Sequence, residues 1–419
     1  MRRIFFGLLL FFVSLQNFAS HILIPMDQSQ VNHLKAYGIV YWMLGGETSV
    51  DWLLNYRGGS FMVKHAQLFE NELIIRGVGY EVISDAEAHK IISMIASPSS
   101  NQDLMKLEQV PKIAVYSPKS NQPWDDAVTL ALTYAEIPYD VVFDDEVLFG
   151  RLPEYDWIHL HHEDFTGQFG KFYRIYRNAP WYVEQQREYE ETAKKHGFTK
   201  VSEMKLAVVK KIRDFVSGGG FMFAMCSATD TYDIALAADG VDICEAMYDG
   251  DRADPDLQQK LDFSGTFAFQ DFIVERNPYE YEFSSIDVDP ATRGLRQDND
   301  FFNLFEFSAK WDPVPTMLTQ NHERIIKGFM GQTTAFRNEV IRSEVMILGE
   351  TKSAREAKYI HGEFGKGFWT FYGGHDPEDY QHRVGEEPTD LNLHPNSPGY
   401  RLILNNILFP AAKKKKQKT

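Results

Sequence analysis

The sequence predicts an α/β protein built on a doubly wound, mostly parallel β-sheet. From residue 112 onward, short apolar runs typical of strands alternate with amphipathic stretches typical of helices. This alternation predicts a parallel sheet with helices on both faces. Polar residues with reactive side chains follow two of these strands, at the edge where such sheets bind ligands. We also expect a small N-terminal α/β unit and an inserted acidic segment.

The first 20 residues resemble a secretory signal peptide. Arg2 and Arg3 precede an apolar run that ends near Leu15, and the small residues Ala19 and Ser20 follow. The run is shorter than the roughly 20 residues that span a bilayer, so we expect cleavage rather than anchoring. The mature protein is therefore expected in the periplasm or outside the cell, without a transmembrane anchor.

Residues 21–108 are expected to form the N-terminal α/β unit. Strand patterns cover residues 21–26, 50–56 and 80–84, and helical periodicity covers 28–44, 69–78 and 85–96. The stretch SPSSNQD at 97–103 has the composition of a linker. The pattern leaves open whether this unit is a separate domain or an extension of the next sheet.

Residues 109–412 are expected to form the main domain. Its first strands are predicted at 112–116, 139–145, 155–162 and 221–226, with helices at 122–137, 202–220 and 229–240. Residues 245–320 are acidic and break this rhythm, which predicts an insertion that covers the site. The pattern then resumes and ends with a helix at 398–409.

Charge and cysteine content limit the partners. The formal net charge is −16, so we do not expect nucleic-acid binding. The basic tail KKKKQKT at 413–419 is most simply a solvated run of charged residues. The alternative is a weak contact with an anionic envelope surface.

Cys226 and Cys244 are the only cysteines of the sequence. We expect no disulfide bond between them, because a helix is predicted between the two positions.

Cys226 is the candidate nucleophile, because it ends a predicted strand just before a predicted helix. A thiol on such a turn is lifted above the sheet and faces a helix N-terminus, provided that the flanking residues are small, as Ala224 and Ala228 are. The alternative is an inert, buried thiol. His375 follows another predicted strand and two glycines, and is the candidate base. Asp376 and Glu378 are expected to orient its ring.

The order of elements from residue 112 to 410 resembles the class I glutamine amidotransferase-like fold. The stretch FGKGFWTFYGGHDPEDY followed by GYRLILNNILF is similar to its ThuA-like branch. The resemblance implies a cysteine nucleophile at the turn and a histidine and carboxylate late in the chain. The sequence departs from the amidotransferase pattern, since AMCSA replaces Gly-x-Cys-x-Gly and HDPE replaces His-x-Glu.

The loop HHED follows a third predicted strand and carries a second set of candidates. His159 and His161 lie on one strand face and can share a metal with Glu163 or Asp164. The alternative is that they line a polar cleft. The resemblance places this loop beside the nucleophile, where the oxyanion would be bound. The substrate-binding candidates are His161, His162, Glu163, Asp164, Gly167, Ser227 and Trp181, the last through stacking on a sugar.

The sequence supports three functions. The first is a thiol-dependent hydrolase or amidotransferase-like enzyme that needs no cofactor and acts on a small amide or carbohydrate-related ligand. The second is a glycan- or envelope-binding protein without catalysis, and the third is a hydrolase that uses a divalent metal at the HHED loop. The whole chain also resembles exported Bacteroidota proteins labelled asparagine synthetase B. We do not expect that activity, because SGGGFM lacks the Asp-Ser of the ATP loop and the mature start lacks a catalytic cysteine.

Overall fold

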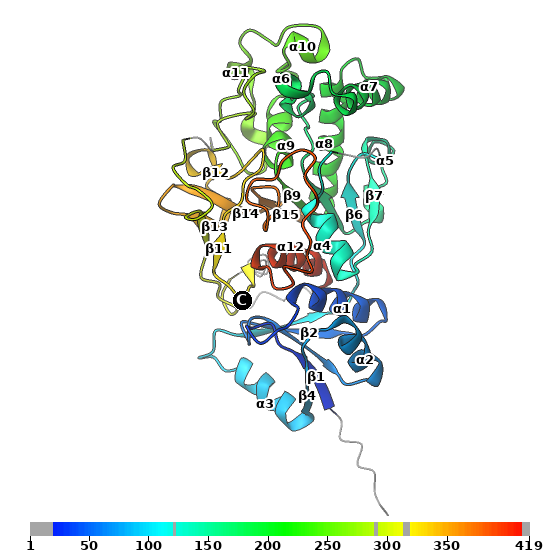
Figure 1. Ribbon diagram of the computed structural model, residues 1–419, viewed down its shortest axis with the longest axis vertical. Coiled ribbons are helices and arrows are strands. Elements are labelled where there is room, and N and C mark those ends of the chain that lie inside the picture. The colour runs from blue at the N-terminus through cyan, green and yellow to red at the C-terminus, as the bar shows by residue number, and fades with distance from the viewer. Residues whose placement is uncertain (1–19, 120–122, 289–291, 313–318, 413–419) are drawn as a thin grey trace, which may run out of the picture.

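The computed structural model describes residues 20–119, 123–288, 292–312 and 319–412, which contain two β-sheets (Figure 1). The expected signal peptide lies outside the described residues except for Ser20, and the Lys-rich tail at 413–419 lies outside them entirely. Among the described residues, no helix is long and apolar enough to cross a membrane.

The N-terminal sheet is antiparallel, with the strand order β4-β1-β3-β2-β5. Its strands are β1 (Ser20–Ile24), β2 (Val50–Leu54), β3 (Ser60–Lys64), β4 (Glu81–Ser84) and β5 (Asp103–Leu107). The helices between them are α1 (His33–Gly45), α2 (Gln67–Arg76) and α3 (Asp85–Ile95). Strands β3 and β5 were not foreseen. The expected linker at 97–103 runs directly into β5, which pairs with β2 and completes the sheet.

The larger sheet mixes parallel and antiparallel strands, in the order β11-β10-β13-β14-β15-β9-β8-β6-β7, with β12 paired to β14. Its first half contains β6 (Ile113–Tyr116), β7 (Asp140–Val142), β8 (Trp157–Leu160) and β9 (Phe221–Met225). Its second half contains β10 (Phe301–Leu304), β11 (Ile325–Lys327), β12 (Phe336–Arg337), β13 (Met346–Thr351), β14 (Glu356–Phe364) and β15 (Gly367–Tyr372). Only β15-β9-β8-β6-β7 pair in parallel. The α/β class is confirmed, but the prediction of a mostly parallel sheet needs correction because the later strands return as hairpins.

Helices cover both faces of the parallel strands, as the alternation of side chains along β6 shows. Ile113 and Val115 pack into one core with residues of α1, α4 (Ala127–Ala135) and α12 (Pro398–Leu408). Ala114 and Tyr116 point to the other face, where α8 (Val201–Gly218) and α9 (Ala228–Ala237) lie (Figure 1). Successive side chains of a strand point to opposite faces of the sheet. Because helices cover both faces here, every position of the strand is apolar instead of every second one.

The remaining helices belong to connections around this sheet. They are α5 (Asp144–Leu148), α6 (Tyr173–Tyr176), α7 (Pro180–Lys195), α10 (Ala246–Asp249) and α11 (Leu257–Lys260). In the acidic stretch expected as an insertion at 245–320, the described residues 250–288 and 292–300 are largely irregular. It includes β10, however, which pairs with β13 and belongs to the sheet. The segment outside the sheet is therefore shorter than expected.

Candidate functional site at the carboxyl edge of the parallel strands

The candidate site lies between β6 and β8, where the strand order switches direction. The chain places β7 on one side of β6 and then adds β8, β9 and β15 on the other side. In sequence order the five strands read 2-1-3-4-5 across the sheet, counted from β6 as the first. Open α/β sheets bind ligands in the crevice at such a switch point, beyond the carboxyl ends of the strands. The loop after β6 carries Asp125 and Asp126, and the loop after β8 begins with His161.

Cys226 occupies the turn between β9 and α9 in a left-handed conformation, with φ of 52°. A non-glycine residue pays about 1 kcal/mol or more for this backbone geometry, which therefore recurs at functional turns. The Cys226 side chain is buried, but it lines a cavity of about 280 Å³. The backbone N–H of Gln332 donates to its Sγ at 3.3 Å. The turn expected from sequence is present, and the sulfur faces a cavity.

His375 reaches the same cavity from the end of β15, the strand that neighbours β9. Gly374 precedes it with φ of 93°, and a Cβ there would lie 2.5 Å from the Phe329 ring. The carbonyl of Gly374 accepts the backbone N–H of Cys226 at 3.2 Å. Residues 374–375 and the Cys226 turn are thus joined at the carboxyl ends of two adjacent strands.

Asp125 is the carboxylate that faces the His375 ring. Its Oδ1 lies 3.5 Å from Nε2 of His375 and 2.9 Å from Nε2 of His382. The two imidazole rings stack at 4.4 Å with an interplanar angle of 15°. Burial lowers the pKa of His382, but Asp125 and then Asp379 outweigh it and raise the pKa to about 9. His382 is therefore a cation at neutral pH, held beside His375 by a shared carboxylate.

Two carboxylates that were expected to orient His375 have other partners. Oδ2 of Asp376 accepts the Tyr400 hydroxyl at 2.8 Å, and its Oδ1 accepts the backbone N–H of Glu378 at 2.8 Å. The Glu378 carboxylate lies 3.1 Å from His394. Asp376 follows His375 on a turning backbone, so its side chain points to α12 rather than back to the ring. The carboxylate that faces the His375 ring is instead Asp125, 250 positions earlier in the chain.

The acidic residues of the HHED loop also turn away from the cavity. The hydroxyl of Tyr189, on α7, donates to Glu163 at 3.1 Å, and burial raises the pKa of Glu163 to about 7. Asp164 accepts the backbone N–H groups of Thr166 and Gly170, at 2.7 and 2.9 Å. These bonds fold the loop, and they use amides that were expected to bind an oxyanion. Gly167 adopts φ of 83° where a Cβ would contact Ser202.

The histidines of the same region converge on one another. His159 and His161 both approach Asp126, while His162 lines the cavity with His375. The rings of His161 and His375 lie 4.6 Å apart. Burial, together with His161 and His375, holds the pKa of His162 well below its usual range, so this imidazole is neutral. Of the residues expected to share a metal, His159 and His161 lie together with Asp126, whereas Glu163 is not part of this group of side chains.

Aromatic side chains form one wall of the cavity. Trp124, Phe172 and Tyr281 line it. Trp181, expected to stack on a sugar, instead packs edge-on against Trp124 at 5.3 Å, behind the lining residues. The Ser227 side chain is buried and its hydroxyl has no hydrogen-bond partner in the described structure. The cavity is sized for a small, partly apolar molecule.

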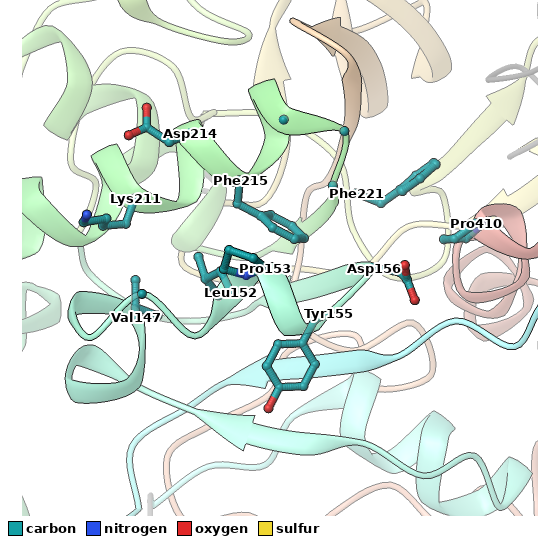
Figure 2. A pocket seen from close by; sticks show the side chains of 14 residues that line it. Val147, Leu152, Pro153, Tyr155, Asp156, Lys211, Asp214, Phe215, Phe221 and Pro410 are labelled. Carbon is teal, nitrogen blue, oxygen red and sulfur yellow. The ribbon is translucent and has the colours of Figure 1, made fainter.

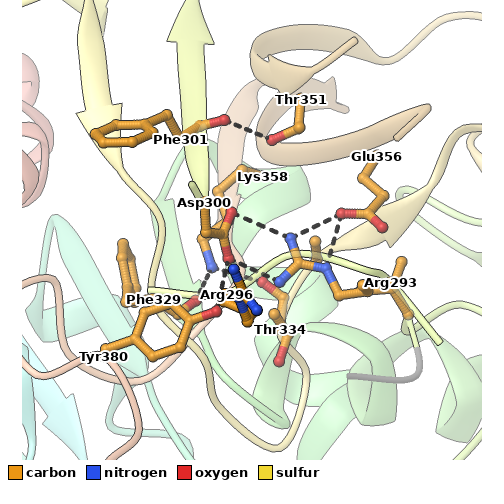
Figure 3. A network of polar contacts seen from close by, with 12 residues as sticks. Arg293, Arg296, Asp300, Phe301, Phe329, Thr334, Thr351, Glu356, Lys358 and Tyr380 are labelled. Atoms are coloured by element: carbon orange, nitrogen blue, oxygen red, sulfur yellow. Dashed lines mark hydrogen bonds and ion pairs between the residues drawn. The ribbon is translucent and has the colours of Figure 1, made fainter. Parts of the chain in front are cut away.

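A buried network (Figure 3) supports the strip of backbone from Phe329 to Thr334, whose residues Met330, Gly331 and Gln332 line the cavity. The Lys358 ammonium donates to the carbonyl of Phe329 and, at 2.7 Å, to that of Thr334. Arg293 joins Asp300 and Glu356 nearby, each at 2.8 Å. The strip also binds the end of β15, because His375 donates its backbone N–H to the Met330 carbonyl. This network places the Gln332 N–H against Sγ of Cys226.

A second, larger cavity of about 640 Å³ lies at the opposite edge of the sheet (Figure 2). Asp156 and Phe221 mark the amino ends of β8 and β9, and Pro410 closes one side. The Asp156 carboxylate in this cavity accepts the backbone N–H of Lys112 at 2.9 Å and so stabilises the residue that precedes β6. Neither cysteine and no histidine lines it. The smaller cavity therefore carries the reactive groups.

Sequence reasoning missed Asp125, Asp126, His382 and Gln332. The pair Asp125 and Asp126 was assigned to a helix start, and Asp126 does cap α4 by accepting the N–H groups of Val128 and Thr129. The useful signal was two adjacent carboxylates at the end of the loop that follows the first parallel strand, directly before a helix. His382 was seven residues beyond His375 in a segment without periodicity. Gln332 acts through its backbone, which leaves no mark in the sequence.

Cys244 is remote from this chemistry. Both cysteines are free, as expected. The Cys244 thiol donates to the carbonyl of Thr166 at 3.3 Å, and burial raises its pKa well above the ordinary value. It is the inert thiol of the pair.

Comparison with known proteins gives no family. No protein-family model and no curated protein matches the chain. Two solved structures of cytoplasmic proteins from Salmonella typhimurium align with 72% of this chain and 100% of theirs, at 11% identity, with TM-scores of 0.34 and 0.35. A GH42 β-galactosidase aligns with 64% of this chain and 28% of its own, at 12% identity and a TM-score of 0.26. These scores are too low to assign a shared fold.

Proposed function

We propose that the protein is a thiol-dependent acyl-transfer enzyme of the amidotransferase-like type, which hydrolyses a small amide or carbohydrate-related substrate. One observation carries the proposal. Cys226 holds a left-handed φ of 52° on a strand–turn–helix, and its sulfur shares a cavity with His375. Strained residues in concave sites are candidates for chemistry, and a cysteine beside a histidine supplies both nucleophile and base.

Asp125 defines the state of the base. In this mechanism its carboxylate, 3.5 Å from Nε2 of His375 and without a hydrogen bond to it in this structure, accepts the Nε2 hydrogen when substrate binds, so that Nδ1 keeps the lone pair. His375 then accepts the Cys226 proton as Sγ bonds to the substrate carbonyl carbon. The π-electron pair of the carbonyl moves to oxygen. The Gln332 N–H, already 3.3 Å from Sγ, is a donor near the position where that negative charge develops.

The intermediate collapses when the electron pair returns from oxygen and breaks the bond to the leaving amine, which takes the proton from His375. Water, deprotonated by His375, then cleaves the thioester and releases the acid with free Cys226. The cation at His382 shares Asp125 with the base and holds the carboxylate in place. The cavity of about 280 Å³ limits the acyl group to a small molecule.

Mass spectrometry of the intact protein tests this function. Incubation with a panel of small amides, activated esters and thioesters is expected to give a covalent acyl adduct on Cys226 that decays with turnover. Cys226→Ala should abolish the adduct. Cys244→Ala is the matched control and should form it normally, because that thiol lies outside the cavity. The proposal fails if no substrate acylates Cys226, or if Cys226→Ala turns over a substrate at the wild-type rate.

A further inference from the structure

Asp126, His159 and His161 form a cluster below the cavity that the proposed thiol chemistry does not use. Nε2 of His159 lies 3.2 Å from Oδ2 of Asp126, and Nδ1 of His161 lies 3.3 Å from the same oxygen. The two histidines are 0% and 1% exposed. One donor atom from each of the three residues lies within 4.8 Å of the others.

The surrounding contacts orient each group toward the centre of the cluster. Nδ1 of His159 lies 3.2 Å from the carbonyl oxygen of Phe223. A carbonyl only accepts, so this nitrogen carries a hydrogen. Nε2 of the same ring is hydrogen-bonded to Oδ2 of Asp126 at 3.2 Å, and in a metal site the ion would take the place of the hydrogen between these two atoms. Oδ1 of Asp126 accepts the two N–H groups at the start of α4, whereas Oδ2 faces the two histidines of the cluster. Such contacts are the usual outer partners of metal-binding imidazoles and carboxylates.

His161 lacks the hydrogen bonds that its burial requires. Neither ring nitrogen has a hydrogen-bond partner in the described structure, although the side chain is 1% exposed. A buried polar atom without a partner costs about 1–3 kcal/mol, so native proteins satisfy nearly all of them. Nδ1 of His161 approaches Asp126 closely but at an angle unsuited to a hydrogen bond.

A metal ion accounts for this combination of short distance and poor angle. Zinc binds nitrogen and oxygen ligands at about 2.0–2.1 Å in tetrahedral geometry, so its ligand atoms lie roughly 3.3–3.4 Å apart. The observed 3.2 and 3.3 Å are close to that spacing. In such a site the lone pair of each ligand atom points at the metal and not at the neighbouring ligand atom. Two ligand atoms can therefore lie close together without the geometry of a hydrogen bond. We propose that Asp126, His159 and His161 bind a divalent first-row transition metal, most simply zinc, which would also give Nδ1 of His161 the partner that it lacks.

The ion would act on the catalytic turn without joining its chemistry. The backbone carbonyl of His161 accepts the N–H of Ala228 at 2.9 Å, and Ala228 begins α9 two residues after Cys226. A metal that fixes His161 therefore stiffens the turn that holds the sulfur. Four other sets of side chains among the described residues meet the same distance criterion, and two of them lie at the cavity: His161 with His162 and His375, and Asp125 with His375 and His382. They include the proposed base, and the variants below separate them from the assigned site.

Metal content tests the proposal without any assay of turnover. Untagged full-length protein, purified without chelators and dialysed against zinc, is expected to hold about one equivalent by elemental analysis. Cobalt in its place should give the strong visible absorption of a tetrahedral site. His159→Gln and His161→Gln should each lower affinity by about 10–100-fold or more. Asp126→Asn keeps an oxygen to cap α4 and provides a second route if a histidine variant does not fold.

Two variants serve as controls. His361→Gln changes a buried histidine outside these clusters, bonded to Thr370, and Cys226→Ala removes the proposed nucleophile; both should retain the metal. A folded wild type that holds no zinc and shows no cobalt spectrum overturns the proposal. So does metal that survives the His159, His161 and Asp126 variants but is lost in His162→Gln or His375→Gln, because the ion would then belong to the cavity. If Cys226→Ala is inactive but retains the metal, the metal proposal is supported. The thiol proposal is then decided separately by the acylation experiment.

Discussion

Cys226 combines a strained backbone with a buried side chain. We therefore expect substitutions at this residue to change the stability of the protein as well as its activity. Its φ of 52° is unfavourable for any residue with a Cβ. We expect Cys226→Gly to be more stable than Cys226→Ala by about 1 kcal/mol, because glycine adopts this conformation without strain. Denaturant unfolding of the two variants measures the difference.

Cys244 supplies the control for this comparison. It lies outside the residues with positive φ, so glycine there should be less stable than alanine, the usual order. If alanine were the more stable replacement at Cys226 as well, the turn would not be strained in solution.

Glu163 gives a pH-dependent prediction at the residue scale. Burial raises its pKa from 4.5 to about 7, so the folded state binds a proton that the unfolded state has lost. This group's contribution to stability is therefore complete below about pH 4.5 and declines as the pH rises through 7. Glu163→Gln keeps an oxygen to accept the Tyr189 hydroxyl and removes the buried charge.

The variant should gain about 2 kcal/mol over the wild type near pH 8 and nothing near pH 4. Thermal or urea unfolding at both pH values checks it. A difference that is equal at the two pH values would show that the effect is packing rather than ionisation.

At the scale of elements, the strip at 329–334 depends on Lys358. Its ammonium is buried and bonded to the carbonyls at both ends of the strip, and burial lowers its pKa to about 7. Lys358→Met leaves both carbonyls without this donor, so we expect a loss of about 2–4 kcal/mol in the free energy of unfolding. Hydrogen exchange should rise at the Gln332 amide, the donor to Cys226.

Lys366→Met is the matched control, since Lys366 is exposed in the turn between β14 and β15, and its effect should be within about 0.5 kcal/mol. Unchanged exchange at Gln332 in Lys358→Met would mean that the strip is held by other contacts.

The same scale shows what sequence reasoning can reach. The turn at Cys226 and the position of His375 follow from strand endings, which local patterns reveal. Strand β5, which shares only Asp103 with the expected linker, was not predicted, because its pairing partner β2 lies some 50 residues earlier and no local signal marks the pair. Asp126 illustrates the same limit within one side chain. Its helix cap is local and predictable, whereas the histidines at its other oxygen come from a different strand.

At the scale of the whole molecule, the N-terminal sheet and the larger sheet share one core. Helix α1 packs against α4 and α12 in a single hydrophobic cluster. The fully buried Arg401 on α12 donates to the carbonyls of Met26 and Gly58 and, at 2.8 Å, to the Tyr37 hydroxyl. Buried polar and apolar contacts therefore join the N-terminal segment at 20–108 to the rest of the described chain.

We expect the protein to unfold in a single cooperative transition. Arg401→Met should lower its stability by about 3 kcal/mol or more, because it leaves several buried acceptors unpaired. Calorimetry measures both. The exposed Arg383 is a control whose change to methionine should have little effect. Two resolved transitions in the wild type would instead indicate that the sheets unfold as separate domains.

The rate of alkylation at Cys226 tests the central claim most directly. With iodoacetamide near pH 7, followed by peptide mass spectrometry of the native protein, Cys226 should react at least about tenfold faster than Cys244. The same rate in His375→Gln and in Asp125→Asn should fall about tenfold, because the base is lost or loses its orientation, while Glu378→Gln should leave it unchanged. Labelling of Cys226 no faster than that of Cys244, or a rate indifferent to His375, would contradict the account.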